Sequence, residues 1–215
     1  MGDARVTGVG VVESAEPLVD LESAGVMRFS DRKRARNPHV SLAREGVARR
    51  LAKAARLLPS GVGLLGIEVF RPPQLQQLFY DTYAERVRRE NPDLGAAALA
   101  RLVSRFVAPP ETAPHPTGAA IDLTLCDEVG VELDLGSNVD ATPEDSAGAC
   151  YTAATGLSRE AAAHRQLLVS VLTEVGLVNY PTEWWHWSYG DRYWAMATGN
   201  THAIDAPTAA PTPGS

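Results

Sequence analysis

The chain has 215 residues, of which 45% are hydrophobic and 21% charged, a composition typical of a globular domain and unlike that of disordered or fibrous chains. The formal charge of -6 at pH 7 comes without a long basic stripe, which argues against nucleic acid as a partner. Two cysteines, no signal-peptide pattern and no membrane-length apolar run lead us to expect a cytoplasmic protein that does not associate with membranes.

The strongest basic run of the chain lies at residues 32–36, with the sequence RKRAR. It is too short to follow a phosphate backbone. We interpret it as a solvated surface turn and assign it no function.

The next part of the chain is predicted to contain a helix, a strand and two further helices. Apolar residues recur every three to four positions over 41–58, which predicts an amphipathic helix with Ser41 as its N-cap. Residues 62–70 form a mostly apolar run and predict a buried strand. Two more helices are expected over 74–89 and 95–106, separated by an Asn-Pro-Asp break.

The second half of the chain is predicted to add most of the strands. These are expected at 119–125, 129–133, 177–180 and 183–189. Residues 136–148 have the composition of a loop, and 158–175 predict an amphipathic helix capped by Ser158.

The order of these elements favours the α+β class. It lacks the regular alternation of a doubly wound sheet, so we expect a central, mainly antiparallel sheet with flanking helices. A single domain should span residues 1–202. Residues 203–215 are rich in Pro, Thr and Ala without a hydrophobic period, and are expected to be a disordered tail.

Two segments offer residues for a catalytic zinc site, which takes three His or Asp/Glu ligands and leaves one position open. His115 ends a proline-rich turn and Asp122 lies on the strand that follows, with small residues between them that let the chain bend. The second segment places Glu183 and His186 three residues apart among tryptophans, and both can face one cavity only if that strand is bulged or turned. Taken singly, these residues also fit structural roles, as a turn residue, a hydrogen-bonded core acid and a satisfied buried histidine.

Taken together, the motifs resemble those of a known family. The stretch P-H-P-T-G-A-A-I-D-L-T-L is similar to S-x-H-x-x-G-x-A-x-D, and E-W-W-H-W is similar to the second motif, of the zinc D,D-peptidases and D-alanyl-D-alanine dipeptidases, which include the VanX-type enzymes of vancomycin resistance. Val69–Pro72 resembles their G-Y-R-P motif, and 133–140 resembles their intervening loop. The resemblance extends from about residue 41 to 197.

The resemblance implies a site and a reaction. His115, Asp122 and His186 would hold one Zn²⁺ per chain, Glu183 would be the general base, and Arg71 would stabilise the oxyanion. The substrate would be a small dipeptide, above all D-alanyl-D-alanine. The resemblance leaves open whether the role is resistance, self-protection or recycling of wall precursors, and it does not give the oligomeric state.

Two departures from the family pattern concern the substrate more than the metal. Ala113 replaces the usual Ser, and Val69-Phe70 replaces Gly-Tyr, so we expect altered contacts with the substrate. A related metallopeptidase or a biosynthetic hydrolase with another small peptide substrate is therefore an alternative. A second is a non-catalytic zinc or peptidoglycan-binding module, which would use tryptophans as stacking platforms. These are Trp184, Trp185, Trp187 and Trp194.

Overall fold

The computed structural model describes residues 3–104 and 106–211, and its centre is a five-stranded sheet. The strands follow the order β3 (Arg28–Phe29), β5 (Gly63–Glu68), β6 (Ala120–Cys126), β8 (His186–Ser188) and β7 (Val178–Asn179). The β3–β5 pair is parallel and the other three pairs are antiparallel. The predicted α+β class with a mainly antiparallel sheet is therefore confirmed.

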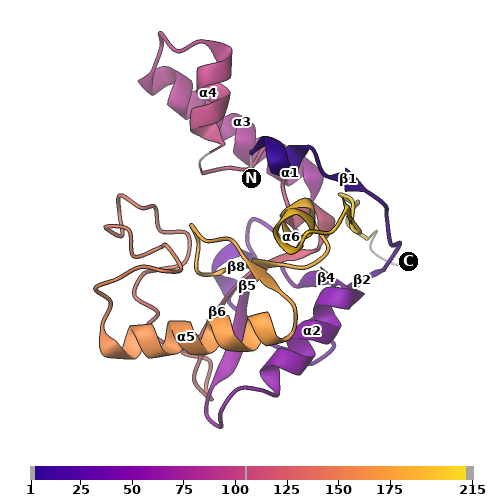
Figure 1. Ribbon diagram of the computed structural model, residues 1–215, viewed down its shortest axis with the longest axis vertical. Helices are drawn as coiled ribbons and strands as arrows, with labels where there is room; N and C mark the ends of the chain where they lie inside the picture. Colours follow the sequence, from indigo (N-terminus) through magenta and orange to yellow (C-terminus); the bar gives the residue numbers. More distant parts are fainter. Residues whose placement is uncertain (1–2, 105, 212–215) are drawn as a thin grey trace.

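Two helices pack with the sheet around the main hydrophobic core. These are α2 (Glu45–Ala55) and α5 (Arg159–Glu174), and α5 crosses in front of β6 in Figure 1. Their buried residues, among them Leu51 and Leu168, join those of β5 and β6 in one cluster. Burial of such side chains is the main stabilising contribution to the fold, at roughly 1.5–3 kcal/mol for each large apolar side chain.

A helical hairpin projects from this body. Helices α3 (Pro73–Glu90) and α4 (Ala96–Val103) pack on each other at the top of Figure 1 around a small cluster of their own, Val87, Leu99 and Val103. Pro73 occupies the first turn of α3, where its missing N–H costs nothing. No helix in the described part of the chain is both long enough and apolar enough to cross a membrane.

The N-terminal forty residues contain short elements that the sequence did not predict. They are α1 (Ala4–Thr7), β1 (Gly10–Val11), β2 (Leu18–Asp20), β3 and the 3-10 helix η1 (Asp31–Lys33). Strands of two or three residues are too short to show a hydrophobic period, so tertiary pairing alone defines them.

The predicted helix over 41–58 begins too early. Residues 42–44 form strand β4 (Leu42–Arg44), which pairs antiparallel with β2, and Ser41 is not an N-cap. The helix starts at Glu45, and its N-terminus is capped from outside, because the Gly46 N–H donates to the Glu16 carboxylate at 2.6 Å. Nothing local in the sequence indicates a cap that lies thirty residues away.

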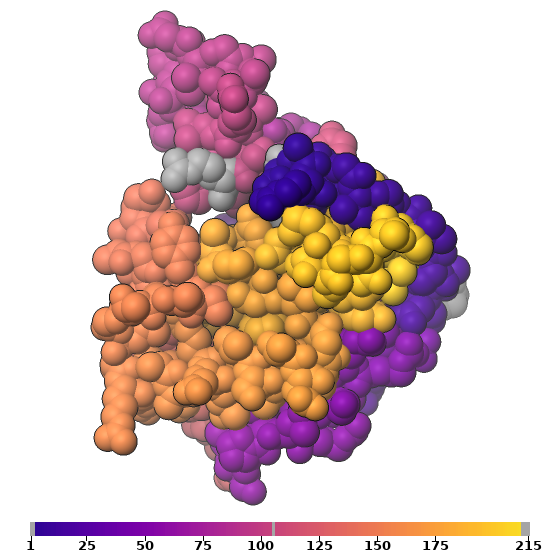
Figure 2. Space-filling model, viewed as in Figure 1, coloured from indigo at the N-terminus to yellow at the C-terminus, as the bar shows by residue number. Residues whose placement is uncertain are grey.

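Two further expectations need correction. Residues 129–133 form no strand, and only an isolated bridge joins Cys126 to Glu132. The expected disorder from residue 203 is wrong for Ala203 and Asp205, which are buried: β9 (His202–Ala203) pairs with β1, and the Thr208 N–H bonds the Pro116 carbonyl. Figure 2 shows this C-terminal segment lying against the N-terminal one. Residues 212–215 lie outside the described part.

Candidate metal centre

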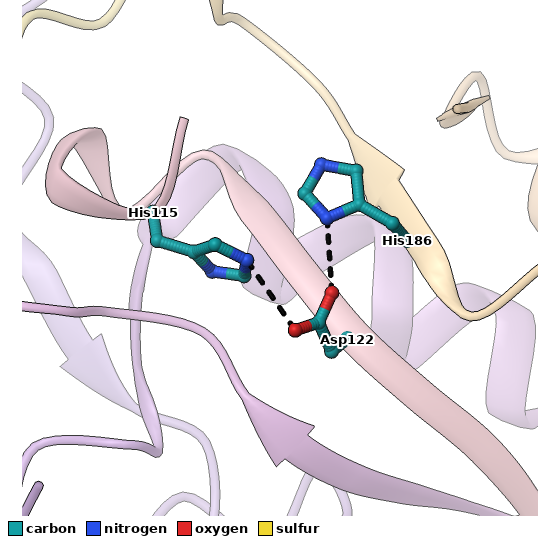
Figure 3. A group of neighbouring side chains, drawn as sticks. All are labelled: His115, Asp122 and His186. Atoms are coloured by element: carbon teal, nitrogen blue, oxygen red, sulfur yellow. Dashed lines mark hydrogen bonds and ion pairs between the residues drawn. The ribbon is translucent and has the colours of Figure 1, made fainter. Parts of the chain in front are cut away.

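Three side chains from three different elements converge on one point. His115 lies in the 3-10 helix η2 (His115–Thr117), Asp122 on β6 and His186 on β8. Their ligand atoms all lie within 4.8 Å of one another and all three side chains are buried. As Figure 3 shows, Asp122 lies between the histidines, with Oδ1 2.9 Å from His186 Nδ1 and Oδ2 3.4 Å from His115 Nε2.

The local chain path explains how His115 reaches the strand residue Asp122. Gly118 ends η2 in the left-handed conformation, with φ of 71°. The turn favours glycine because of this φ, and a Cβ at this position would in addition displace the end of the Leu18 side chain, 2.5 Å away. The Thr117 hydroxyl accepts a hydrogen bond from the Ala119 N–H at 3.0 Å and fixes the start of β6.

The donor set fits a divalent metal. His115 Nδ1 lies 2.7 Å from the Val69 carbonyl oxygen, so Nδ1 carries a proton and Nε2 is the nitrogen that faces Asp122. Burial alone would raise the pKa of Asp122, but His115 and His186 hold it well below its usual value, so the carboxylate is ionised. One carboxylate and two imidazoles on rigid elements are the set that a catalytic zinc takes.

Glu183 lies in the turn before β8, not on a strand as the predicted range 183–189 implied. Its carbonyl accepts the His186 N–H at 3.1 Å, and this turn brings Glu183 and His186 to the same cavity. Of the two expected geometries, a bulged strand or a turn, the structure has the turn. Burial raises the pKa of the Glu183 carboxyl above its usual value, and Asp122 raises it further against the opposite effect of His186.

Most of the tryptophans beside Glu183 belong to the core. Trp184 and Trp187 are each 1% exposed, and the Trp187 indole N–H donates to the Trp184 carbonyl. Trp185 is buried as well, although it reaches the cavity wall, and Trp194 packs on Tyr189 with ring centroids 4.9 Å apart. A row of exposed stacking platforms is therefore absent among these four residues, which argues against the binding-module alternative.

Arg71 lines the same cavity and is held there by a buried ion pair with Glu68. Its Nε and Nη2 lie 3.2 and 2.5 Å from the two carboxylate oxygens of Glu68, and Nη1 donates to Gln76 at 2.8 Å. Burial raises the pKa of Glu68, but Arg71, His115 and Lys33 together lower it to about 2. Arg71 therefore has a structural role as an ion-pair partner, and it also lines the cavity.

Lys33 shows that our interpretation of the basic run was wrong at one position. Its ammonium lies 3.3 Å from Glu68, 3.7 Å from the metal-ligand candidate Asp122 and 3.0 Å from Asp140. Burial lowers the pKa of Lys33, but these carboxylates raise it above the usual value, so the side chain is charged. Charge clustering in the sequence gave no signal that Lys33 is held inside the cavity, or that Arg32 and Arg36 also line it.

Asp140 and Glu68 are two further cavity residues that sequence reasoning missed. Asp140 adopts the left-handed conformation with φ of 65°, which is uncommon outside glycine and directs attention to function. Glu68 is a charged residue in an otherwise apolar strand, three positions before Arg71, and that placement is the signal that could have identified it.

All of these groups line one cavity of about 690 Å³, which is within the range of small-molecule sites. The two positions that depart from the expected family pattern do not contribute to it: Ala113 and Phe70 are buried in the protein and are not among the lining residues. Their effect on a substrate would therefore have to be indirect.

Comparison with known proteins gives consistent results. A family model described as D-ala-D-ala dipeptidase matches residues 19–203. The D-alanyl-D-alanine dipeptidase of Synechocystis sp. is 29% identical over 225 residues, covering 90% of this chain and 90% of the relative. The enzyme of that name from Enterococcus faecium is 30% identical, covering 67% and 71%, and the one from Escherichia coli is 39% identical over 34% and 35%.

Proposed function

Since this chain belongs to the D-ala-D-ala dipeptidase family of metallopeptidases, we propose that it hydrolyses D-alanyl-D-alanine at a zinc ion held by His115, Asp122 and His186. The observation that carries the proposal is the convergence of these three ligand atoms within 4.8 Å in a cavity that also contains Glu183 and Arg71. A purely structural zinc site would need neither of the last two residues.

The metal, when bound, would supply a water activated near neutral pH and a Lewis acid for the scissile carbonyl. Glu183 is the group placed to take the proton of that water and to pass it to the leaving amine. Its raised pKa brings the carboxyl closer to working pH, which suits a general base that must also act as an acid.

Arg71 is proposed to stabilise the negative charge that develops on the carbonyl oxygen. Glu68 holds the guanidinium through two hydrogen bonds, so the donor is oriented before the substrate arrives. Removal of a donor of this kind typically costs about 10²- to 10³-fold in rate.

The two ends of the dipeptide need partners of opposite charge. The cavity-lining carboxylates are Glu68, Asp122, Asp140 and Glu183. Glu68 is occupied by Arg71, and the proposal assigns Asp122 to the metal and Glu183 to proton transfer. Asp140, whose side chain is 52% exposed, is then the carboxylate that can receive the substrate's ammonium.

A cytoplasmic location is part of the same proposal. Cys126 and Cys150 are both free thiols, which agrees with a reducing cytoplasm where cell-wall precursors are made. A related metallopeptidase with another small peptide substrate is the alternative.

The proposal is tested by incubating the purified protein with D-alanyl-D-alanine and with L-alanyl-L-alanine, with and without a chelator, and measuring free alanine. Chelator-sensitive cleavage of the D,D substrate, restored by Zn²⁺, is the expected result. A metal-loaded protein that leaves D-alanyl-D-alanine intact would contradict the proposal.

A further inference from the structure

Gln76 connects the proposed oxyanion donor Arg71 to the helical hairpin. Its side-chain oxygen Oε1 accepts a hydrogen bond from Arg71 Nη1 at 2.8 Å, and its Nε2 donates to the Ala108 carbonyl oxygen, also at 2.8 Å. Gln76 lies near the start of α3 and Ala108 follows the end of α4, so this side chain links the two ends of the hairpin. Gln76 is 1% exposed, and a buried amide depends on such partners.

The hydrogen bond to Ala108 fixes the direction in which the Gln76 amide points. A carboxamide has an oxygen that accepts and an NH2 group that donates. The Ala108 carbonyl can only accept, so it holds the NH2 group, and the oxygen is left facing the guanidinium, which can only donate. The reversed amide would place its NH2 group against the cation and its oxygen against the carbonyl oxygen. Gln76 therefore presents a fixed acceptor to Arg71.

Arg71 is held by two different elements, one at each side of its guanidinium. Nε and Nη2 donate to Glu68, at the end of β5, at 3.2 and 2.5 Å, while Nη1 donates to Gln76 on α3. The Phe79 ring, on the same helix, has its centroid 5.2 Å from the Arg71 Cζ. A guanidinium has five N–H groups. Among the described residues three of them have acceptors, which leaves one on Nη1 and one on Nη2 for a ligand.

We infer that Gln76 is a positioning residue for the proposed reaction, which orients Arg71 so that its two uncommitted N–H groups meet the oxyanion. The ion pair with Glu68 alone would tie the guanidinium to one element, and the two side chains could tilt together. A second contact from α3 removes that freedom. Donors fixed in advance are the effective ones for charge that develops in a transition state. The inference rests on the proposed function.

The first test compares two neighbouring glutamines in the zinc-loaded protein. Gln76→Met keeps the length of the side chain and removes both hydrogen bonds. It should lower kcat for D-alanyl-D-alanine by about 10-fold, part of the cost of losing a whole donor, and leave KM within about 2-fold. Affinity for a phosphinate analogue of the dipeptide, whose tetrahedral anion resembles the transition state, should weaken by about 10-fold. Gln77→Met, which removes an exposed side chain bonded to Asp81, is the control and should change none of these quantities.

A double-mutant cycle separates positioning from a general loss of structure. In an Arg71→Met background, Gln76→Met should lower kcat no further, because the group that Gln76 orients is gone. If Gln76 had only a structural role, its substitution would lower kcat by the same factor with or without Arg71. That result would overturn the inference.

A spectroscopic measurement keeps the test decisive if Gln76→Met folds poorly. NMR spectra of the substrate-free protein report rotation about the Cζ–Nη1 bond of Arg71. The two Nη1 protons should give separate signals in the wild type and in Gln76→Glu, which keeps an oxygen acceptor, and one averaged signal in Gln76→Met. Averaged signals in the wild type would overturn the inference. Separate signals in a wild-type protein that leaves D-alanyl-D-alanine intact would instead contradict the proposed function.

Discussion

Asp122 and His186 are register partners on adjacent antiparallel strands, and their side chains meet at 2.9 Å between Oδ1 and Nδ1. The sheet itself therefore sets the distance between two of the three proposed ligands. His115 is positioned independently, by the Gly118 turn and by the hydrogen bond from its Nδ1 to Val69. Two of the proposed ligands are therefore fixed by the sheet and the third by its own hydrogen bond, so the set is ordered before any metal binds.

Asp122→Ala should abolish metal binding while leaving the fold in place. The substitution removes the only carboxylate of the set, and because loss of a supporting partner alone costs about 10- to 100-fold in metal affinity, loss of a ligand should cost at least about 100-fold. Zinc content after dialysis against a competing chelator measures this. His202→Ala, which removes an exposed histidine outside the cavity, should retain one zinc per chain. Equal zinc content in the two variants would contradict the assigned ligand set.

Glu183→Gln should lower kcat by about 10²- to 10⁴-fold with little change in zinc content, because the amide cannot accept the proton. The pH dependence of the wild-type activity gives a second test of Glu183 as the base. The base acts in its ionised form, so activity should fall as pH drops through the pKa of Glu183, which burial places above the usual value for a glutamate.

The control for this prediction is Glu174→Gln, which neutralises an exposed glutamate at the end of α5. It should keep both the rate and the acidic limb of the profile. If Glu183→Gln keeps an acidic limb at the wild-type position, another group must be responsible for it and the assignment of the base is wrong.

The sequence predicted the candidate site better than it predicted the surroundings of that site. His115, Asp122 and His186 could be proposed because each lies in a local motif, and the structure brings the three together, although their role as ligands stays a prediction. Lys33 and Asp140 were missed because their importance depends on contacts between segments that lie 35 to 107 residues apart in the chain. The helix start at Glu45 was missed for the same reason, since its cap comes from Glu16.

Glu68→Gln should remove an acid-sensitive contribution to stability. The pKa of Glu68 is depressed from 4.5 to about 2 in the folded protein, so its stabilising effect is present above pH 4.5 and is lost as pH falls toward 2. The shift corresponds to a contribution to the free energy of unfolding on the order of 3 kcal/mol. Melting temperatures should therefore differ most between wild type and variant near pH 6, and the difference should narrow by pH 3. A difference that stays constant over this range would contradict the proposed ion-pair contribution.

Arg165 is predicted to hold the loop that carries Asp140. From its buried position on α5 it donates to the backbone carbonyls of Leu135, Ala149 and Tyr151, which lie at the two ends of that loop. Arg165→Met would leave these acceptors without their donor and should lower the free energy of unfolding by about 3 kcal/mol.

The same change should release the loop locally, because its ends would no longer be tied to α5. Limited proteolysis within residues 136–148 should therefore become faster in Arg165→Met, and affinity for the free dipeptide should fall as Asp140 loses its fixed position. Arg159→Met removes an exposed arginine from the first turn of the same helix and should change neither property. Equal cleavage rates in the two variants would mean that the loop is held by its own turns, such as the Thr142–Asp145 hydrogen bonds, and not by Arg165.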